Sequence, residues 1–148
     1  MPVTAGNLAP ADIPVRLAAR ALDVVVVVVL NVVLGRQMGF GFDWLVIGAA
    51  LIWLYFAVLD TAVGATLGKL VSGLRVVGAD GRWPSLTQSL KREAFTAVGA
   101  IPFVGPLIAV GLWVWFVIVM RRSPARQGPH DVFAGGTRVV RWREQGTP

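Results

Sequence analysis

Three long apolar stretches constrain this chain more than any other feature of its sequence. A helix that crosses a membrane needs roughly 17–25 predominantly apolar residues, and the stretches at about 17–34, 44–63 and 94–120 reach or exceed that length. A backbone surrounded by lipid must satisfy its own hydrogen bonds, so an isolated apolar span has to be helical. The sequence therefore predicts an all-α membrane protein with three to four transmembrane or re-entrant helices.

Composition narrows the classes of function. Only 15% of the 148 residues are charged, whereas a soluble domain carries about 25%. The chain has no cysteine and only one histidine, His130, which excludes thiolate chemistry and sites built from several histidines. We therefore expect no enzyme activity, no cofactor and no metal. The net charge of +6 fits basic loops at a membrane surface, so we expect no nucleic-acid partner.

The first and third stretches are both interrupted. Asp23 lies inside 17–34, which makes a cleaved signal peptide a poor interpretation of that stretch. The stretch 94–120 contains Pro102 and Pro106, and proline ends or kinks a helix. The sequence therefore predicts a short helix, a break and a second helix over about 107–120, preceded by an amphipathic segment at 85–93.

The distribution of Lys and Arg predicts the topology. One such residue lies in 35–43, five lie in 64–93 and six lie in 121–148. Because basic loops stay in the cytoplasm, we expect both 64–93 and the C-terminal segment on the cytoplasmic side of the cell (plasma) membrane. Three full crossings would put these two segments on opposite sides, whereas both lie on one side if the broken stretch 94–120 enters and leaves the bilayer on the same side.

Two short runs are typical of strands. Leu74–Val77 and Thr137–Val140 are similar β-type runs, and the turn signal Asp80-Gly81 follows the first. If both lie in the cytoplasm, they can pair as a small β-type cap. The alternative is that they belong to two unrelated loops.

Four segments resemble the RDD family of small multi-pass membrane proteins, which is named for one arginine and two aspartates. They are Arg16-Leu17-Ala18-Ala19 with Asp23, Gly64 to Lys69, Gly73 to Val77, and Gly128 to Gly135. The resemblance covers about 13–141, so we expect one domain there, between a flexible tail at 1–12 and a C-terminal tail at 142–148. It implies a multi-spanning protein, in a family of mostly unknown function that is sometimes proposed to transport ions or other ligands.

The charged residues of the first helix suggest a polar cluster. Arg16 and Asp23 are two helical turns apart and share one face. An ionisable group inside a span usually faces a partner or a water-filled cavity. Asp23 could bind a proton or cation, or could form a structural ion pair with a guanidinium; we favour the ion pair. Arg20 is the nearest local candidate for that pair, and Arg16 and the basic cytoplasmic segments could also contribute. We expect Asp131 to accept backbone N–H groups or an arginine, which predicts one cluster of Arg16, Asp23 and Asp131.

Other polar residues are secondary candidates. Arg20, His130 and Asp60 could contribute to the cluster, although Asp60 near the end of its span is expected to be solvated. His130 and Asp131 are adjacent and do not naturally form the oriented pair of a hydrolase triad. The spacing of Gly64 and Gly68 favours close helix approach.

Arg121, Arg122 and Arg126 form a basic cluster that either sets the topology or contacts anionic lipid headgroups.

The sequence leaves two functions open. We expect a small transporter or cation/proton antiporter subunit, acting as a homo-oligomer or with a membrane-complex partner because one chain has few segments to enclose a path. The alternative is a non-catalytic interaction or assembly subunit of a larger membrane complex.

Overall fold

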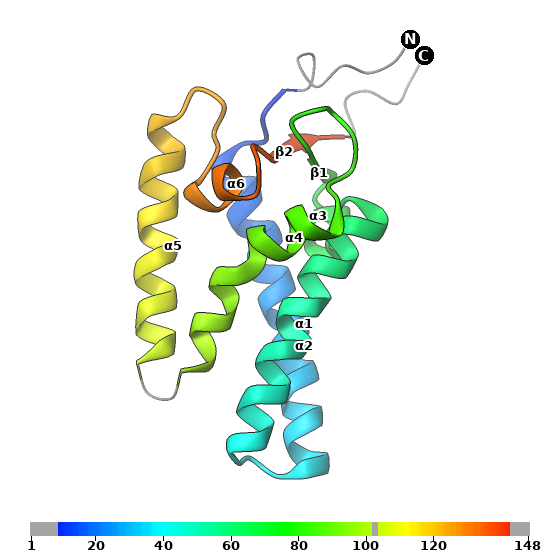
Figure 1. The fold of residues 1–148 in the computed structure, drawn as a ribbon, viewed down its shortest axis with the longest axis vertical. Coiled ribbons are helices and arrows are strands. Elements are labelled where there is room, and N and C mark those ends of the chain that lie inside the picture. The colour runs from blue at the N-terminus through cyan, green and yellow to red at the C-terminus, as the bar shows by residue number, and fades with distance from the viewer. Residues whose placement is uncertain (1–8, 102–103, 143–148) are drawn as a thin grey trace.

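The computed structural model describes residues 9–101 and 104–142. Its two longest helices, α1 (Ile13–Met38) and α2 (Phe42–Val63), form an antiparallel hairpin (Figure 1). The other elements are α3 (Leu67–Val71), β1 (Leu74–Val77), α4 (Leu86–Glu93), the 3-10 helix η2 (Ala94–Ala100), α5 (Gly105–Arg122), α6 (Pro129–Phe133) and β2 (Arg138–Arg141). The structure confirms a mostly helical fold with a small sheet.

Helices α1 and α2 have the length and composition of membrane-crossing helices. They contain 26 and 22 residues and are the two helices of the described residues that are long and apolar enough to cross a membrane. Large apolar side chains cover the outside of α1, where Val25 is 61% exposed and Val28 is 54% exposed. An exposed apolar surface of this extent is suited to contact with lipid or another protein.

The stretch 94–120 is broken, as the sequence predicts. Figure 1 shows η2 leading away from the upper end of the molecule and α5 returning to it. Within the described residues, the backbone therefore enters and leaves this stretch at one end. Pro102 lies outside the described residues.

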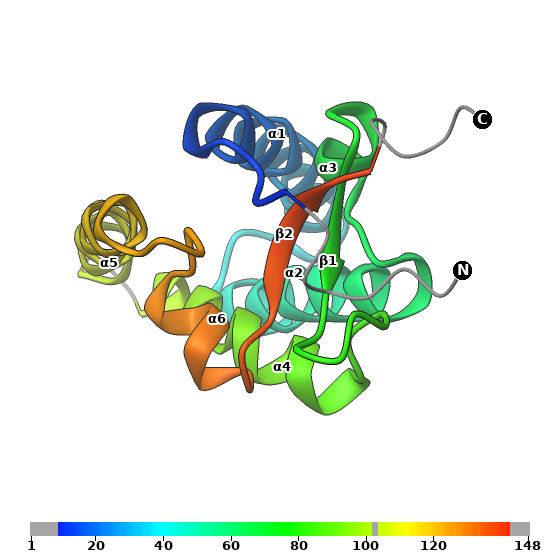
Figure 2. The ribbon, with the colours of Figure 1, turned by 90° about the horizontal axis from the view of Figure 1, so that it is seen from above.

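A cap closes the end of the molecule at which α1 begins and α5 ends. We define the cap as residues 9–12 with α3, β1, α4, α6 and β2 (Figures 1 and 2). Strands β1 and β2 pair antiparallel, with Val76 opposite Val139, so the two β-type runs are not unrelated loops. The predicted tails 1–12 and 142–148 lie mostly outside the described residues. However, Ala11 donates a backbone hydrogen bond to Val139, which makes residues 9–12 part of the cap.

The sheet packs on the beginning of α1. One buried apolar cluster contains residues from the segment 9–12, from α1 and from both strands. Its members are Ala11, Ala19, Leu74, Val76 and Val139, and Val15 packs against them. This contact fixes the cap over the hairpin.

Gly68 allows α3 to lie directly on α1. A Cβ atom at this position would stand 2.0 Å from the backbone oxygen of Ala19 and 3.0 Å from Cγ of Asp23. Gly64, four residues earlier, ends α2 in the left-handed region with φ of 68°, which favours glycine. Gly64 thus allows the turn after α2, and Gly68 allows the close approach of α3 to α1.

We predict that Gly68→Ala destabilises the protein. The methyl group collides with rigid backbone, and overpacking of this kind costs about 1–3 kcal/mol or more. Gly111 in α5 is the matched control, since nothing lies within 4 Å of its added Cβ, and Gly111→Ala should leave stability unchanged or raise it. Thermal unfolding of the detergent-solubilised proteins measures both, and equal midpoints for the two variants would contradict the close packing.

Candidate functional site

Asp131 is the centre of the buried charged network. Its carboxylate is fully buried and lies 3.1 Å from Nη2 of Arg16 in α1 and 3.1 Å from Nε of Arg92 in α4. It also accepts hydrogen bonds from the backbone N–H of Gly128 and the hydroxyl of Thr137. Although burial raises the pKa of Asp131, the charges of Arg92 and then Arg16 hold that pKa well below its usual range.

Asp60 is the second carboxylate of this network that contacts two cationic side chains. Nζ of Lys69 lies 2.7 Å from its Oδ1, and Nη1 of Arg92 lies 3.2 Å from its Oδ2. The expectation that Asp60 is solvated is therefore wrong, because its side chain is 0% exposed. The reason is that α3 and α4 fold back over the end of α2 and bring their cations onto this carboxylate. Arg92 joins Asp60 to Asp131.

Arg20 pairs with Glu93 and not with Asp23. Its Nη1 lies 3.1 Å from Oε2 of Glu93, and its guanidinium carbon lies 3.7 Å from the centre of the Phe56 ring. The predicted local pair is wrong because Arg20 faces α4 and the aromatic side chains, whereas Asp23 faces α3 and α2. The ring contact adds a cation–π attraction to the ion pair.

Asp23 has neutral partners. It accepts hydrogen bonds from the hydroxyls of Tyr55 and Thr66 and, at 2.8 Å, from the backbone N–H of Gly68. No ion pair within residues 9–101 and 104–142 includes Asp23. The structure thus brings Arg16 and Asp131 together but gives Asp23 a separate site, which replaces both the favoured guanidinium pair and the single three-residue cluster.

His130 lies among aromatic side chains under the cap. Its ring centre is 4.7 Å from that of Phe116 and 5.6 Å from that of Phe95. Its Nε2 is 3.6 Å from Oδ2 of Asp131, which is too long for a hydrogen bond, and Nδ1 is buried without a hydrogen-bond partner among the described residues. Burial lowers the pKa of His130 to about 4 despite the opposing charge of Asp131, so the ring is neutral near pH 7.

The three arginines of the basic cluster occupy different environments. Arg121 and Arg122 are exposed at the end of α5. Arg126 instead forms an ion pair with Asp12, and its backbone carbonyl accepts a hydrogen bond from Arg16. Arg126 therefore contacts the cap through Asp12, while Arg121 and Arg122 are exposed on the surface.

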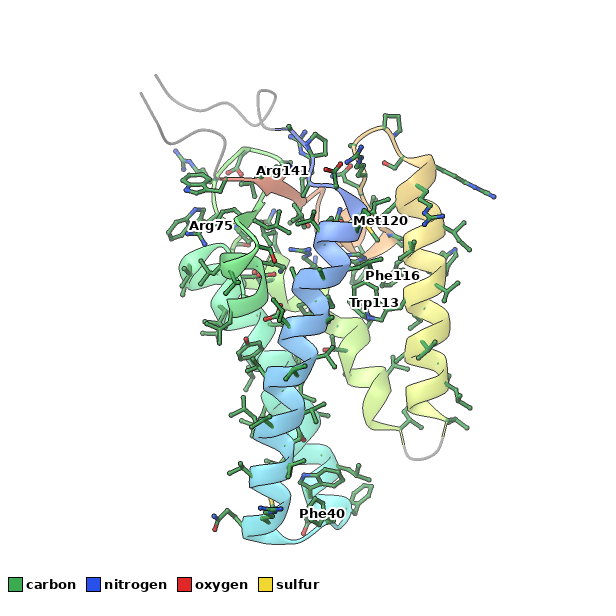
Figure 3. The ribbon with its side chains drawn as sticks, turned by 180° about the vertical axis from the view of Figure 1, so that it is seen from behind. Phe40, Arg75, Trp113, Phe116, Met120 and Arg141 are labelled. Carbon is green, nitrogen blue, oxygen red and sulfur yellow. The ribbon has the colours of Figure 1, made fainter. Side chains whose placement is uncertain are left out.

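A small cavity of about 30 Å³ lies among the charged groups. Figure 3 shows Trp113, Phe116 and Met120 projecting from α5 on the side of α1, and Trp113 and Met120 line this cavity. The charged and polar residues that line it are Arg16, Arg20, Lys69, Arg92, Glu93 and His130. In the described part of the chain, no group of three or more His, Cys, Asp and Glu could hold a metal ion.

Sequence reasoning missed several members of the site. Lys69 and Arg92 pair with the buried Asp60, Glu93 pairs with Arg20, and Tyr55 and Thr66 donate hydrogen bonds to Asp23. One signal was available, because 85–93 is an amphipathic segment whose charges directly precede a long uncharged stretch. No comparable signal marks the two hydroxyl residues.

We predict that His130 makes stability depend on pH. Between the ordinary pKa of 6.5 and the lowered value of about 4, the unfolded chain binds a proton that the folded chain does not. Stability is therefore complete above about pH 6.5 and falls as the pH decreases, by up to about 1.4 kcal/mol per pH unit. In His130→Phe, which keeps an aromatic ring, the thermal midpoint should depend less on pH between 5 and 6.5. Identical pH profiles of variant and wild type would refute this role.

No curated protein and no solved structure matches the chain. The sequence model of the RDD family matches residues 10–135, a range that includes Arg16, Asp23, Asp60 and Asp131. That match covers most of the 148 residues, and together with the two apolar helices it shows that the chain belongs to the RDD family and is membrane-associated.

Proposed function

We propose that this RDD-family protein is a subunit of a cation/proton exchanger and that Asp23 is the exchanging group. One observation carries the proposal. Among the buried carboxylates of the described residues, Asp60, Glu93 and Asp131 each contact a cationic side chain, whereas Asp23 contacts two hydroxyls and one backbone N–H. A carboxylate without a counterion can gain or lose a proton and leave every ion pair intact.

The partners of Asp23 suit such an exchange. A hydroxyl donates to a carboxylate and accepts from a carboxylic acid, so Tyr55 and Thr66 can remain hydrogen-bonded in both protonation states. Tyr55 also lines an open groove of about 530 Å³ between α1 and α2, together with Asn31 and Gln37. These three polar side chains give an approach to Asp23 along an otherwise apolar surface.

Charge supports a cytoplasmic position for the cap. The basic segments 64–93 and 121–148 contribute eleven of the fourteen Lys and Arg residues, and such segments are retained in the cytoplasm. Arg121 and Arg122 would then lie at the level of the lipid headgroups, where anionic phosphates attract them.

A single chain of this size offers few helices to enclose a path, so the exchanger acts as a homo-oligomer or with a partner. A second groove, of about 550 Å³, separates α1 from α5 and is lined mainly by apolar residues such as Val24 and Val117. This open groove favours a second candidate, an assembly subunit that receives a helix of another membrane protein and carries no flux.

We predict that Asp23→Asn folds normally and loses exchange activity. Asparagine retains an acceptor oxygen for the neutral donors around Asp23, so the thermal midpoint should stay close to that of the wild type. It cannot bind and release a proton, so pH-driven cation flux into liposomes should fall to the level of empty vesicles. The measurement is flux and thermal unfolding on the same purified preparation.

The matched control is Asp43→Asn. Asp43 is exposed at the opposite end of the hairpin, so its amide variant should retain flux. Wild-type flux that persists in Asp23→Asn would contradict the assigned role of Asp23. If wild-type protein gives no flux above that of empty liposomes, the transport function is contradicted and the assembly-subunit function is favoured.

A further inference from the structure

The buried charges of the ion-pair network do not cancel. Within the described residues, the ion pairs between the cap and the long helices involve four cations, Arg16, Arg20, Lys69 and Arg92, and three carboxylates, Asp60, Glu93 and Asp131. Asp23 takes part in none of these pairs, and His130 is neutral near pH 7. Four minus three leaves one positive charge in a site where an uncompensated charge is expensive.

The cavity beside this network is suited to a small anion. Its charged lining consists of all four cations and of Glu93, whose carboxylate pairs with Arg20. His130 also lines it, and its buried Nδ1 has no hydrogen-bond partner among the described residues. Its volume of about 30 Å³ exceeds the 10–15 Å³ or so that one water requires. A halide ion is comparable to a water in size, whereas phosphate and lipid headgroups are much larger.

We propose that this cavity binds one chloride ion, which compensates the excess charge among Arg16, Arg20, Lys69 and Arg92. The ion lies between the beginning of α1, the end of α4 and the aromatic face of α5, so its binding stabilises the junction between the cap and the helices. This site is separate from Asp23 and does not depend on the exchange reaction.

Deprotonation of a lysine within the chain would also remove the excess positive charge. Burial lowers the pKa of Lys69, and a neutral Lys69 would leave three cations for three carboxylates. The two possibilities differ in their response to anions, since only the first requires chloride.

The test is thermal unfolding of the detergent-solubilised protein while chloride replaces gluconate at constant ionic strength. Stabilisation by a ligand grows as RT ln(1 + [L]/Kd), so the midpoint should rise by about 3–6 °C when chloride is at ten times its dissociation constant. Lys69→Gln should abolish this rise, because Arg92 still compensates Asp60 and the remaining charges cancel. Lys91→Gln removes an exposed charge from the same region and should preserve the rise.

Chlorine NMR provides a readout that needs no variant. Wild-type protein should broaden the chloride resonance, and bromide should reverse the broadening by competition. Absence of both the broadening and the midpoint shift would overturn the proposal and favour a neutral Lys69. A full chloride response in Lys69→Gln would overturn the proposal that chloride compensates an excess positive charge. If Lys69→Gln does not fold, Arg20→Gln also removes one of the four cations and should likewise abolish the response. Asp23→Asn should retain the response, which separates this test from that of exchange.

Discussion

The contacts of the Asp131 carboxylate hold together parts of the chain that are distant in sequence. Arg16 comes from the first turn of α1, Arg92 from the end of α4, and Asp131 itself from α6. Arg92 continues the chain of contacts to Asp60 at the end of α2. In a buried network of this kind, removal of one partner costs about 3–5 kcal/mol because the remaining charge is left without compensation. The position of the cap over the hairpin therefore depends on these pairs.

This dependence restricts how the chain can cross a membrane. Residues 64–93 and 121–142 supply both strands of the sheet and both partners of the Arg92–Asp131 pair, so they lie at one end of the molecule and we expect both on one side of the membrane. The intervening stretch satisfies that condition because η2 is only seven residues long and is followed by the return of α5. A plain third crossing would separate the two halves of the network.

The helices and the sheet could be predicted from the sequence, but the pairing of charges could not. Apolar length determines the spans, and β-branched runs that end at turn signals indicate the strands. The partner of Arg20 depends instead on where α4 lies in space, and burial of Asp60 depends on two short helices that fold back over α2. Asp23 looked like half of an ion pair because an arginine stands three residues before it, whereas its donors come from α2 and from the segment around α3.

The cap joins two basic segments of the chain, and we propose that both lie on one side of the membrane. Single cysteines introduced into this cysteine-free chain test it most directly, at the exposed positions Gly41, Arg82 and Pro124, with a membrane-impermeant thiol reagent applied to intact cells. Gly41→Cys should be labelled, whereas Arg82→Cys and Pro124→Cys should react only after permeabilisation. Labelling of Arg82→Cys and Pro124→Cys from opposite sides of the membrane would contradict the structure described here.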